Sequence, residues 1–159
     1  MRKSIRSLRT RWMLPLLLMQ LLLPLGSSFG VQAQEERSTE QLRDKMSRAM
    51  GYHDLALLLI KKGEYDQASA EAHKILQLRF PPEQERPVSQ SLAMIADRLG
   101  DARKFDAAQT LLDDALKSLD RSSTRASILL TKGRLYLKAG DEDMAIEYYK
   151  KAFELDGRK

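Results

Sequence analysis

The chain has 159 residues, of which 27 are Lys or Arg and 22 are Asp or Glu, and its formal net charge is +5. It contains no Cys, which excludes disulfide bonds, thiol nucleophiles and a lipid-modified cysteine anchor. Residues 1–33 hold five basic and no acidic side chains, so residues 34–159 carry no net charge. This balance removes the electrostatic basis of nucleic-acid binding, and we expect no nucleic-acid partner.

The first 33 residues have the pattern of a signal peptide. A basic start is followed by an apolar run over residues 12–25 and then by a small-residue site that ends at Ala33. This pattern predicts cleavage between Ala33 and Gln34 and export, to the periplasm of a bacterium. The apolar run is shorter than the roughly 20 residues that span a bilayer. The alternative is an uncleaved membrane anchor, with the rest of the chain facing the periplasm.

Residues 34–48 lie between the signal peptide and a set of repeated segments. The first four are polar or charged, and we expect them to be mobile. Ser38 and Gln41 have the spacing of a capping box, in which each side chain bonds the backbone N–H of the other residue. Apolar residues follow at helical spacing. A helix is therefore predicted from about Thr39, and it continues into the first repeated segment.

Three segments, 49–82, 89–122 and 126–159, share one pattern of two helices joined by a turn. Gly63 and Gly140 mark the first and last turns, and Arg103 stands at the middle one. Small residues let two helices approach closely, and aromatic residues fill the space around them. In the last segment the residues that carry this spacing are Leu129, Gly133, Tyr136, Ala145, Tyr149, Ala152 and Leu155.

The joints between the segments are predicted to be loops. Residues 81–87 include three prolines, which must end one helix before the next can begin. Ser122, Ser123 and Thr124 offer hydroxyl groups that suit the N-cap of the following helix.

The spacing of these three segments resembles the tetratricopeptide repeat, most closely in residues 126–159. The resemblance implies an all-α fold, a right-handed α-solenoid of three helix–turn–helix repeats. Two departures stand out in the last segment: Lys132 replaces a preferred Leu, and Gly157 replaces a preferred Pro. The family implies a noncatalytic protein or peptide partner, bound in the concave groove between the repeats.

The resemblance also indicates which residues face that groove, because the first helix of each repeat lines it. Asn is absent from the chain, and Arg134 is the one fixed positive charge in the set, so a clamp for a C-terminal carboxylate is disfavoured. The expected groove residues are Met50, His53, Leu57, Ile60, Gln90, Ala93, Asp97, Ser127, Leu130, Arg134 and Leu137.

Residues 54–60 are apolar on nearly every side of the predicted helix. Leu55, Ala56 and Leu59 satisfy the inward face of a repeat helix, so we expect Leu57 and Ile60 to form an apolar strip for a partner. The alternative is that the segment around residues 42–46 folds back over the strip.

No group of residues in the sequence has the pattern of an enzyme site. His53 and His73 lie on different helices without a further ligand at metal spacing, and no glycine-rich phosphate loop is present. Asp113 and Asp114 are adjacent and point to different sides of a helix. We therefore expect no catalysis, no metal and no cofactor.

The last predicted helix carries Ile146, Tyr149 and Phe153 at helical spacing. In a solenoid such residues meet the next repeat, so we expect a second copy of the chain or the partner to cover them. The alternative is that these apolar residues are simply exposed to solvent, as isolated apolar residues often are.

Together, these observations predict an exported adaptor or assembly factor. The alternatives are a membrane-anchored structural subunit of an envelope complex and an accessory domain of an enzyme.

Overall fold

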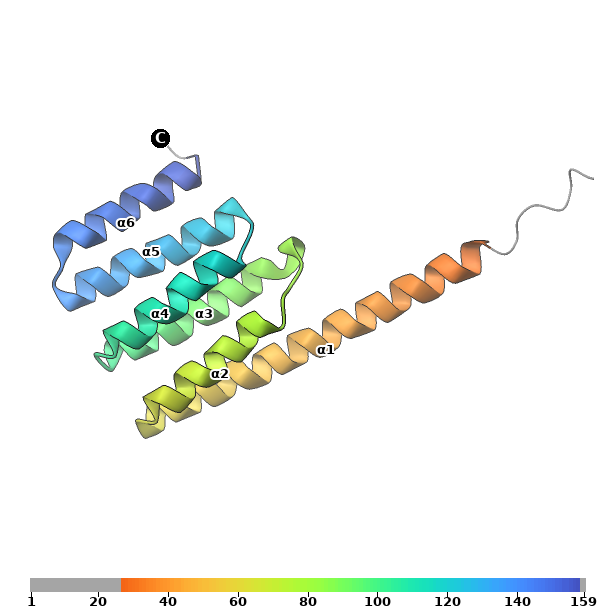
Figure 1. Ribbon diagram of the computed structural model, residues 1–159, viewed down its shortest axis with the longest axis horizontal. Coiled ribbons are helices and arrows are strands. Elements are labelled where there is room, and N and C mark those ends of the chain that lie inside the picture. The colour runs from red at the N-terminus through yellow and green to blue at the C-terminus, as the bar shows by residue number, and fades with distance from the viewer. Residues whose placement is uncertain (1–26, 158–159) are drawn as a thin grey trace, which may run out of the picture. The chain divides into compact units, whose positions relative to one another are not determined.

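The computed structural model describes residues 27–157 of the chain, and the side chains of residues 34–157 (Figure 1). Helices account for nearly all of this part, and it contains no strand, which confirms the predicted all-α helical-repeat fold. The elements in chain order are α1 (Ser27–Lys62), α2 (Tyr65–Gln77), the 3-10 helix η1 (Pro82–Gln84), α3 (Glu85–Asp101), α4 (Phe105–Ser118), α5 (Ser122–Ala139) and α6 (Glu142–Leu155).

The chain divides into two units, residues 1–40 and 41–159. In the first unit, residues 34–37 belong to α1, which differs from the mobile segment that we expected. The hydroxyl groups of Ser38 and Thr39 donate hydrogen bonds to the carbonyl of Glu35, one turn back in the same helix. The predicted capping box at Ser38 is therefore wrong, because Ser38 lies inside a helix and not at its start.

The expected signal peptide lies mostly outside the described residues. Residues 1–26 are not described, and the expected cleavage position, Ala33–Gln34, falls within α1. Among the helices that the structure describes, none is both long enough and apolar enough to span a membrane.

Three helix pairs, each joined by a tight turn, make up the second unit. The turn residues Gly63, Arg103 and Gly140 stand at equivalent repeat positions and all have left-handed φ angles, +83°, +58° and +86°. Glycine adopts this conformation without steric cost, whereas an L side chain pays roughly 1 kcal/mol. The middle repeat thus keeps the turn geometry of its neighbours even though it lacks their glycine.

Close packing within the last pair follows the predicted small–large pattern. A Cβ atom added to Gly133 would lie 2.6 Å from the Tyr149 ring, so the ring occupies the space that the missing side chain leaves. A Cβ atom at Gly100 would similarly lie 2.5 Å from a methyl carbon of Leu135, where α3 meets α5. The prediction that Gly133 and Tyr149 bring the two helices of this pair together is confirmed.

The buried departure from the family pattern, Lys132, is accommodated by its neighbours. Its side chain is almost fully buried, and its ammonium group forms an ion pair with Asp113 of α4. The same ammonium lies 4.6 Å from the centre of the Tyr148 ring in α6. Burial alone would lower the pKa of Lys132, but the interactions with Asp113 and Tyr148 together outweigh burial and raise it. Lys132 therefore stays charged and links three helices.

Both predicted joints differ from the structure. Residues 81–87 are not one loop, because η1 covers residues 82–84 and α3 already begins at Glu85. Pro87 fits within the first turn of α3, where its missing N–H has no helical partner to lose. At the second joint, the N-cap of α5 is Arg121, which makes no side-chain capping bond, and Ser122 is the first helical residue.

The buried carboxylate of Glu85 holds the residues just before α5, and the predicted hydroxyl caps are not formed. It accepts hydrogen bonds from the backbone N–H groups of Asp120 and Arg121, at 2.8 and 2.9 Å, and from the Thr124 hydroxyl at 2.8 Å. Burial would raise the pKa of Glu85, but these three hydrogen bonds outweigh it and hold the pKa below its ordinary value. Glu85 therefore joins the start of α3 to the start of α5.

Candidate functional site

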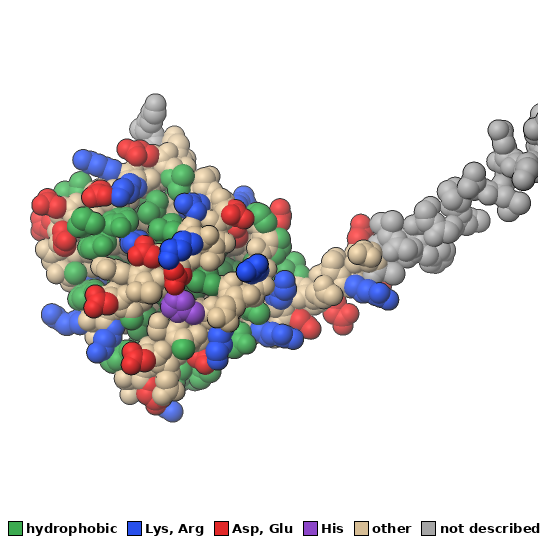
Figure 2. Space-filling model, viewed as in Figure 1, with side chains coloured by type: hydrophobic (Ala, Val, Ile, Leu, Met, Phe, Trp, Pro, Cys, Tyr) green, Lys and Arg blue, Asp and Glu red, His purple; other side chains and the backbone are tan. Residues whose placement is uncertain are grey.

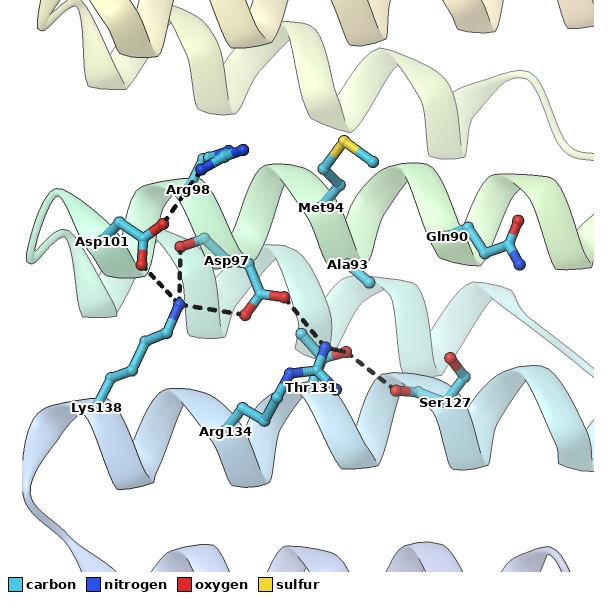
Figure 3. Close-up of a pocket in the computed structure, with 10 residues that line it drawn as sticks. All are labelled: Gln90, Ala93, Met94, Asp97, Arg98, Asp101, Ser127, Thr131, Arg134 and Lys138. Atoms are coloured by element: carbon cyan, nitrogen blue, oxygen red, sulfur yellow. Dashed lines mark hydrogen bonds and ion pairs between the residues drawn. The ribbon is translucent and has the colours of Figure 1, made fainter.

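A groove runs between α3 and α5, the first helices of the second and third pairs, and has a volume of about 590 Å³ (Figure 3). We call it the charged half of the candidate site. Polar and charged side chains dominate its lining, and Met94 and Ala93 are the apolar exceptions. The lining residues are Gln90, Ala93, Met94, Asp97, Arg98, Asp101, Ser127, Thr131, Arg134 and Lys138.

Ion pairs across the charged half tie α3 to α5. Arg134 donates to an oxygen of Asp97 at 3.1 Å, and Lys138 donates to Asp101 at 2.7 Å (Figure 3). Arg98 lies 3.6 Å from the other oxygen of Asp101. The hydrogen bond from Lys138 holds the pKa of Asp101 below its ordinary value. Three cations thus face two carboxylates, which leaves the groove with one positive charge in excess.

The remaining oxygen of Asp97 has an unusual position. Its Oδ1 atom is buried and accepts no hydrogen bond within the described residues, although the Lys138 ammonium lies 3.5 Å away. Buried carboxylate oxygens normally have a hydrogen-bond donor. The Lys138 ammonium is therefore the charged partner of this oxygen.

A second groove adjoins the first, between α1 and α3, and has a volume of about 250 Å³. We call it the apolar half. Met50 is 64% exposed and Met94 is 48% exposed, so two flexible thioether side chains stand open to solvent. The lining residues are Met46, Ala49, Met50, His53, Asp54, Ile75, Pro87, Val88, Gln90, Ser91 and Met94.

The two halves are joined by shared residues and by one hydrogen bond. Gln90 and Met94 line both grooves, so the halves form one continuous surface along α3. In Figure 3 the Met94 side chain points away from α5, whereas Asp97 reaches toward it. His53 of α1 makes a 2.8 Å hydrogen bond with the Ser91 hydroxyl of α3, which holds the two walls of the apolar half together.

The structure brings most of the predicted groove residues together. Leu57 and Ile60 do not lie where they were predicted, because they are partly buried against the core and line neither half of the site. They pack there because the buried stripe of α1 is broader than expected, whereas Leu55, expected to point inward, is exposed. Leu130 and Leu137 also line neither half. The predicted residues that do line the site are Met50, His53, Gln90, Ala93, Asp97, Ser127 and Arg134.

Sequence reasoning missed several residues of the same surface. Met94, Asp101 and Lys138 each lie four positions after a groove residue that was predicted, so they share its helix face. Helical periodicity applied to Gln90, Asp97 and Arg134 would have found them. Arg98, four positions after Met94, completes the stripe along α3.

His73, which lies outside the groove, links two helices. His73 lies 3.2 Å from Asp114, and it also bonds the Ser69 carbonyl in its own helix at 2.7 Å. The contact with Asp114 joins α2 to α4. No group of three or more His, Asp or Glu side chains placed to hold a metal occurs in the described part of the chain.

Comparison with known proteins bears on the last helix pair. No curated protein sequence matches the chain. The family description "Tetratricopeptide repeat" matches residues 126–158, which contain α5 from its second turn onward, the Gly140 turn and all of α6. The last helix pair is therefore similar to a tetratricopeptide repeat, and such repeats are typically noncatalytic modules for protein–protein interaction.

Proposed function

We propose that the chain is an exported adaptor or assembly factor, and that it holds a segment of a partner polypeptide along α1, α3 and α5. The observation that carries this proposal is the continuity of the apolar and charged halves through Gln90 and Met94. One bound segment can contact both halves at once. Tetratricopeptide repeats generally mediate contacts between proteins, which supports a polypeptide as the ligand.

The two halves favour a segment with two kinds of side chain. Met46, Met50 and Met94 are unbranched and adapt their shape to an apolar side chain. Arg98, the least neutralised cation of the charged half, suits an acidic side chain of the same segment. An extended or helical segment that carries an apolar residue next to an acidic one meets both requirements.

Site-specific photocrosslinking in cells tests this proposal. A photoreactive amino acid at Gln90, which lines both halves, should capture a protein partner. The same amino acid at Thr110, exposed on α4 and outside the groove, serves as the matched control. Equal crosslinking from both positions, or none from Gln90, would contradict binding in the groove.

Export of the chain is a separate part of the proposal. The basic start, the apolar run and the small residues before Gln34 support a cleaved signal peptide. The intact mass of the protein from the periplasmic fraction should then match a chain that begins at Gln34. Recovery of the uncleaved chain in the membrane would favour the alternative, a membrane-anchored structural subunit held by residues 12–25.

A further inference from the structure

The outer face of α6 presents large apolar side chains to solvent. Ile146 is 51% exposed and Phe153 is 48% exposed, two turns apart on the same side of the helix. Tyr149, expected on this face, is instead partly buried and fills the space at Gly133. In the space-filling view, hydrophobic side chains gather among charged ones over α5 and α6 (Figure 2).

Equivalent positions in the other repeats show what such a face normally contacts. Counted from the repeat starts at 49, 89 and 126, Phe153 corresponds to Leu76 in α2 and Leu116 in α4. Both leucines are partly buried and pack against the core. In these repeats the first helix of the following pair lies against the second helix of the preceding one. Phe153 therefore occupies a position that, in the other repeats, is packed against the core, whereas Ile146 corresponds to the polar residues Ser69 and Gln109.

The part of α1 after residue 41 presents the matching surface. Leu55 is 42% exposed and Leu58 is 58% exposed. Leu55 corresponds to Ile95 in α3 and Lys132 in α5, and both of these are almost completely buried. Leu58 corresponds to Leu135 in α5, which is fully buried, and to Arg98 in α3, which is exposed. A helix in the position of a preceding α6 would cover Leu55 as α4 covers Lys132, and Leu58 lies beside it one turn further along α1.

Charges at the ends of the two helices agree with this pairing. α4 and α5 run antiparallel, because Asp113 pairs with Lys132 while the Leu116 carbonyl accepts from Arg125. The same arrangement would place the start of α6 beside the end of α1. The start of α6 carries Glu142 and Asp143, and the end of α1 carries Lys61 and Lys62. All four are exposed and form no ion pair within the described part of the chain.

We propose that α6 of one copy of the chain packs against α1 of the next copy, so that chains associate head to tail. The contact repeats between chains the packing of α4 on α5 within one chain. Because the two surfaces are different, the contact is heterologous: a chain that uses one face still has the other free. The inference is independent of the groove, whose residues take no part in it.

Two double variants, each lacking one face, test the proposal. Leu55→Glu/Leu58→Glu removes the α1 face, and Ile146→Glu/Phe153→Glu removes the α6 face. The native chain as isolated from cells should show a mass in sedimentation velocity that rises with concentration, while each variant alone stays monomeric. An equimolar mixture of the two variants should form one-to-one dimers and nothing larger, because one intact face of each kind remains.

Controls separate this assembly from other outcomes. Met94→Glu, at a similarly exposed groove residue, should assemble like the native chain, and melting temperatures should show that both double variants fold. Reversing the charges with Lys61→Glu/Lys62→Glu should weaken assembly, and mixing with Glu142→Lys/Asp143→Lys should restore it, because both contacts between the two variants then join opposite charges. A native chain that is monomeric at all concentrations, or a Leu55→Glu/Leu58→Glu variant that still dimerises alone through two α6 faces, would overturn the proposal.

Discussion

The apolar and charged halves of the groove occupy equivalent places between first helices, yet they are built from different chemistry. The apolar half has methionine side chains on both walls, with a single hydrogen bond between His53 and Ser91 across it. The charged half is crossed by ion pairs of Arg134 and Lys138 with Asp97 and Asp101. Burial of apolar surface supplies affinity with little dependence on salt, whereas exposed charges mainly orient a ligand and are screened by salt. Along α3, the apolar half is thus suited to supply the affinity for a ligand, and the charged half is suited to orient it.

The largest effect is expected from Glu85, because its loss would undo the joint between the helices that form the charged half. Glu85→Ala removes the acceptor of two partly buried backbone N–H groups and of the Thr124 hydroxyl, and it should lower the free energy of unfolding by about 3 kcal/mol. Urea denaturation measures this change. Glu83→Ala, at an exposed position in η1, is the control and should leave stability nearly unchanged. Similar values for both variants would contradict the role of Glu85 in joining α3 to the start of α5.

A smaller effect, on binding and not on folding, is expected from the apolar half. Met50→Lys together with Met94→Lys should weaken partner binding by about 2 kcal/mol, because two apolar contact surfaces are lost. Both side chains are exposed, so the melting temperature should stay close to that of the native chain. Titration calorimetry with the partner identified by crosslinking measures the affinity. A large loss of thermal stability would show that the two methionines belong to the core.

Neutralising the charged half should have a weaker effect with a distinct signature. Arg134→Gln together with Lys138→Gln should cost roughly 1 kcal/mol of partner affinity and flatten its dependence on salt concentration. The methionine variant should keep the salt dependence of the native chain. If both variants show the same salt dependence, the assignment of separate roles to the two halves is wrong.

The smallest effect is expected from acid. Glu85 has a folded-state pKa below its ordinary value of 4.5, so its stabilising contribution is fully present above that pH. The contribution is lost as the pH falls through the lower folded-state pKa. Comparison of the native chain with Glu85→Gln should therefore show a smaller stability difference in acid than at pH 7. A difference independent of pH would contradict the charged state of Glu85.

Much of the fold could be predicted because its signals are local. Gly133 and Tyr149 stand at a spacing that only a closely packed helix pair explains, and Gly63 and Gly140 mark two turns directly. The link from Glu85 to the start of α5 could not be predicted, because Glu85 lies 35 positions before the first N–H group that it accepts from. Ser122 and Thr124 were the plausible local candidates. A residue so far away in the sequence has no characteristic spacing from the helix start that it contacts, so a sequence pattern cannot reveal it.

The candidate site was predicted less completely, for two physical reasons. The family resemblance indicates about one groove residue per helical turn. Met94 and Lys138, which lie on the same helix face four positions after predicted residues, were therefore overlooked. In α1, apolar residues on nearly every side give no periodic signal, and Leu57 could not be distinguished from Leu58. The structure places Leu57 partly against the core and Leu58 in solvent.

The Glu85 carboxylate also has a consequence for how the chain responds to a protease. Its hydrogen bonds to Asp120 and Arg121 join the start of α3 to the residues just after α4. The two ends of the second helix pair are therefore held together without a covalent bond. The exposed turn at Arg103 is a natural site for cleavage by a trypsin-like enzyme. A cut there divides the chain, but the Glu85 bonds and the packing of α3 on α4 and α5 hold the two fragments together. The nicked protein should therefore migrate as one particle, and with Glu85→Ala the fragments should separate at a lower urea concentration.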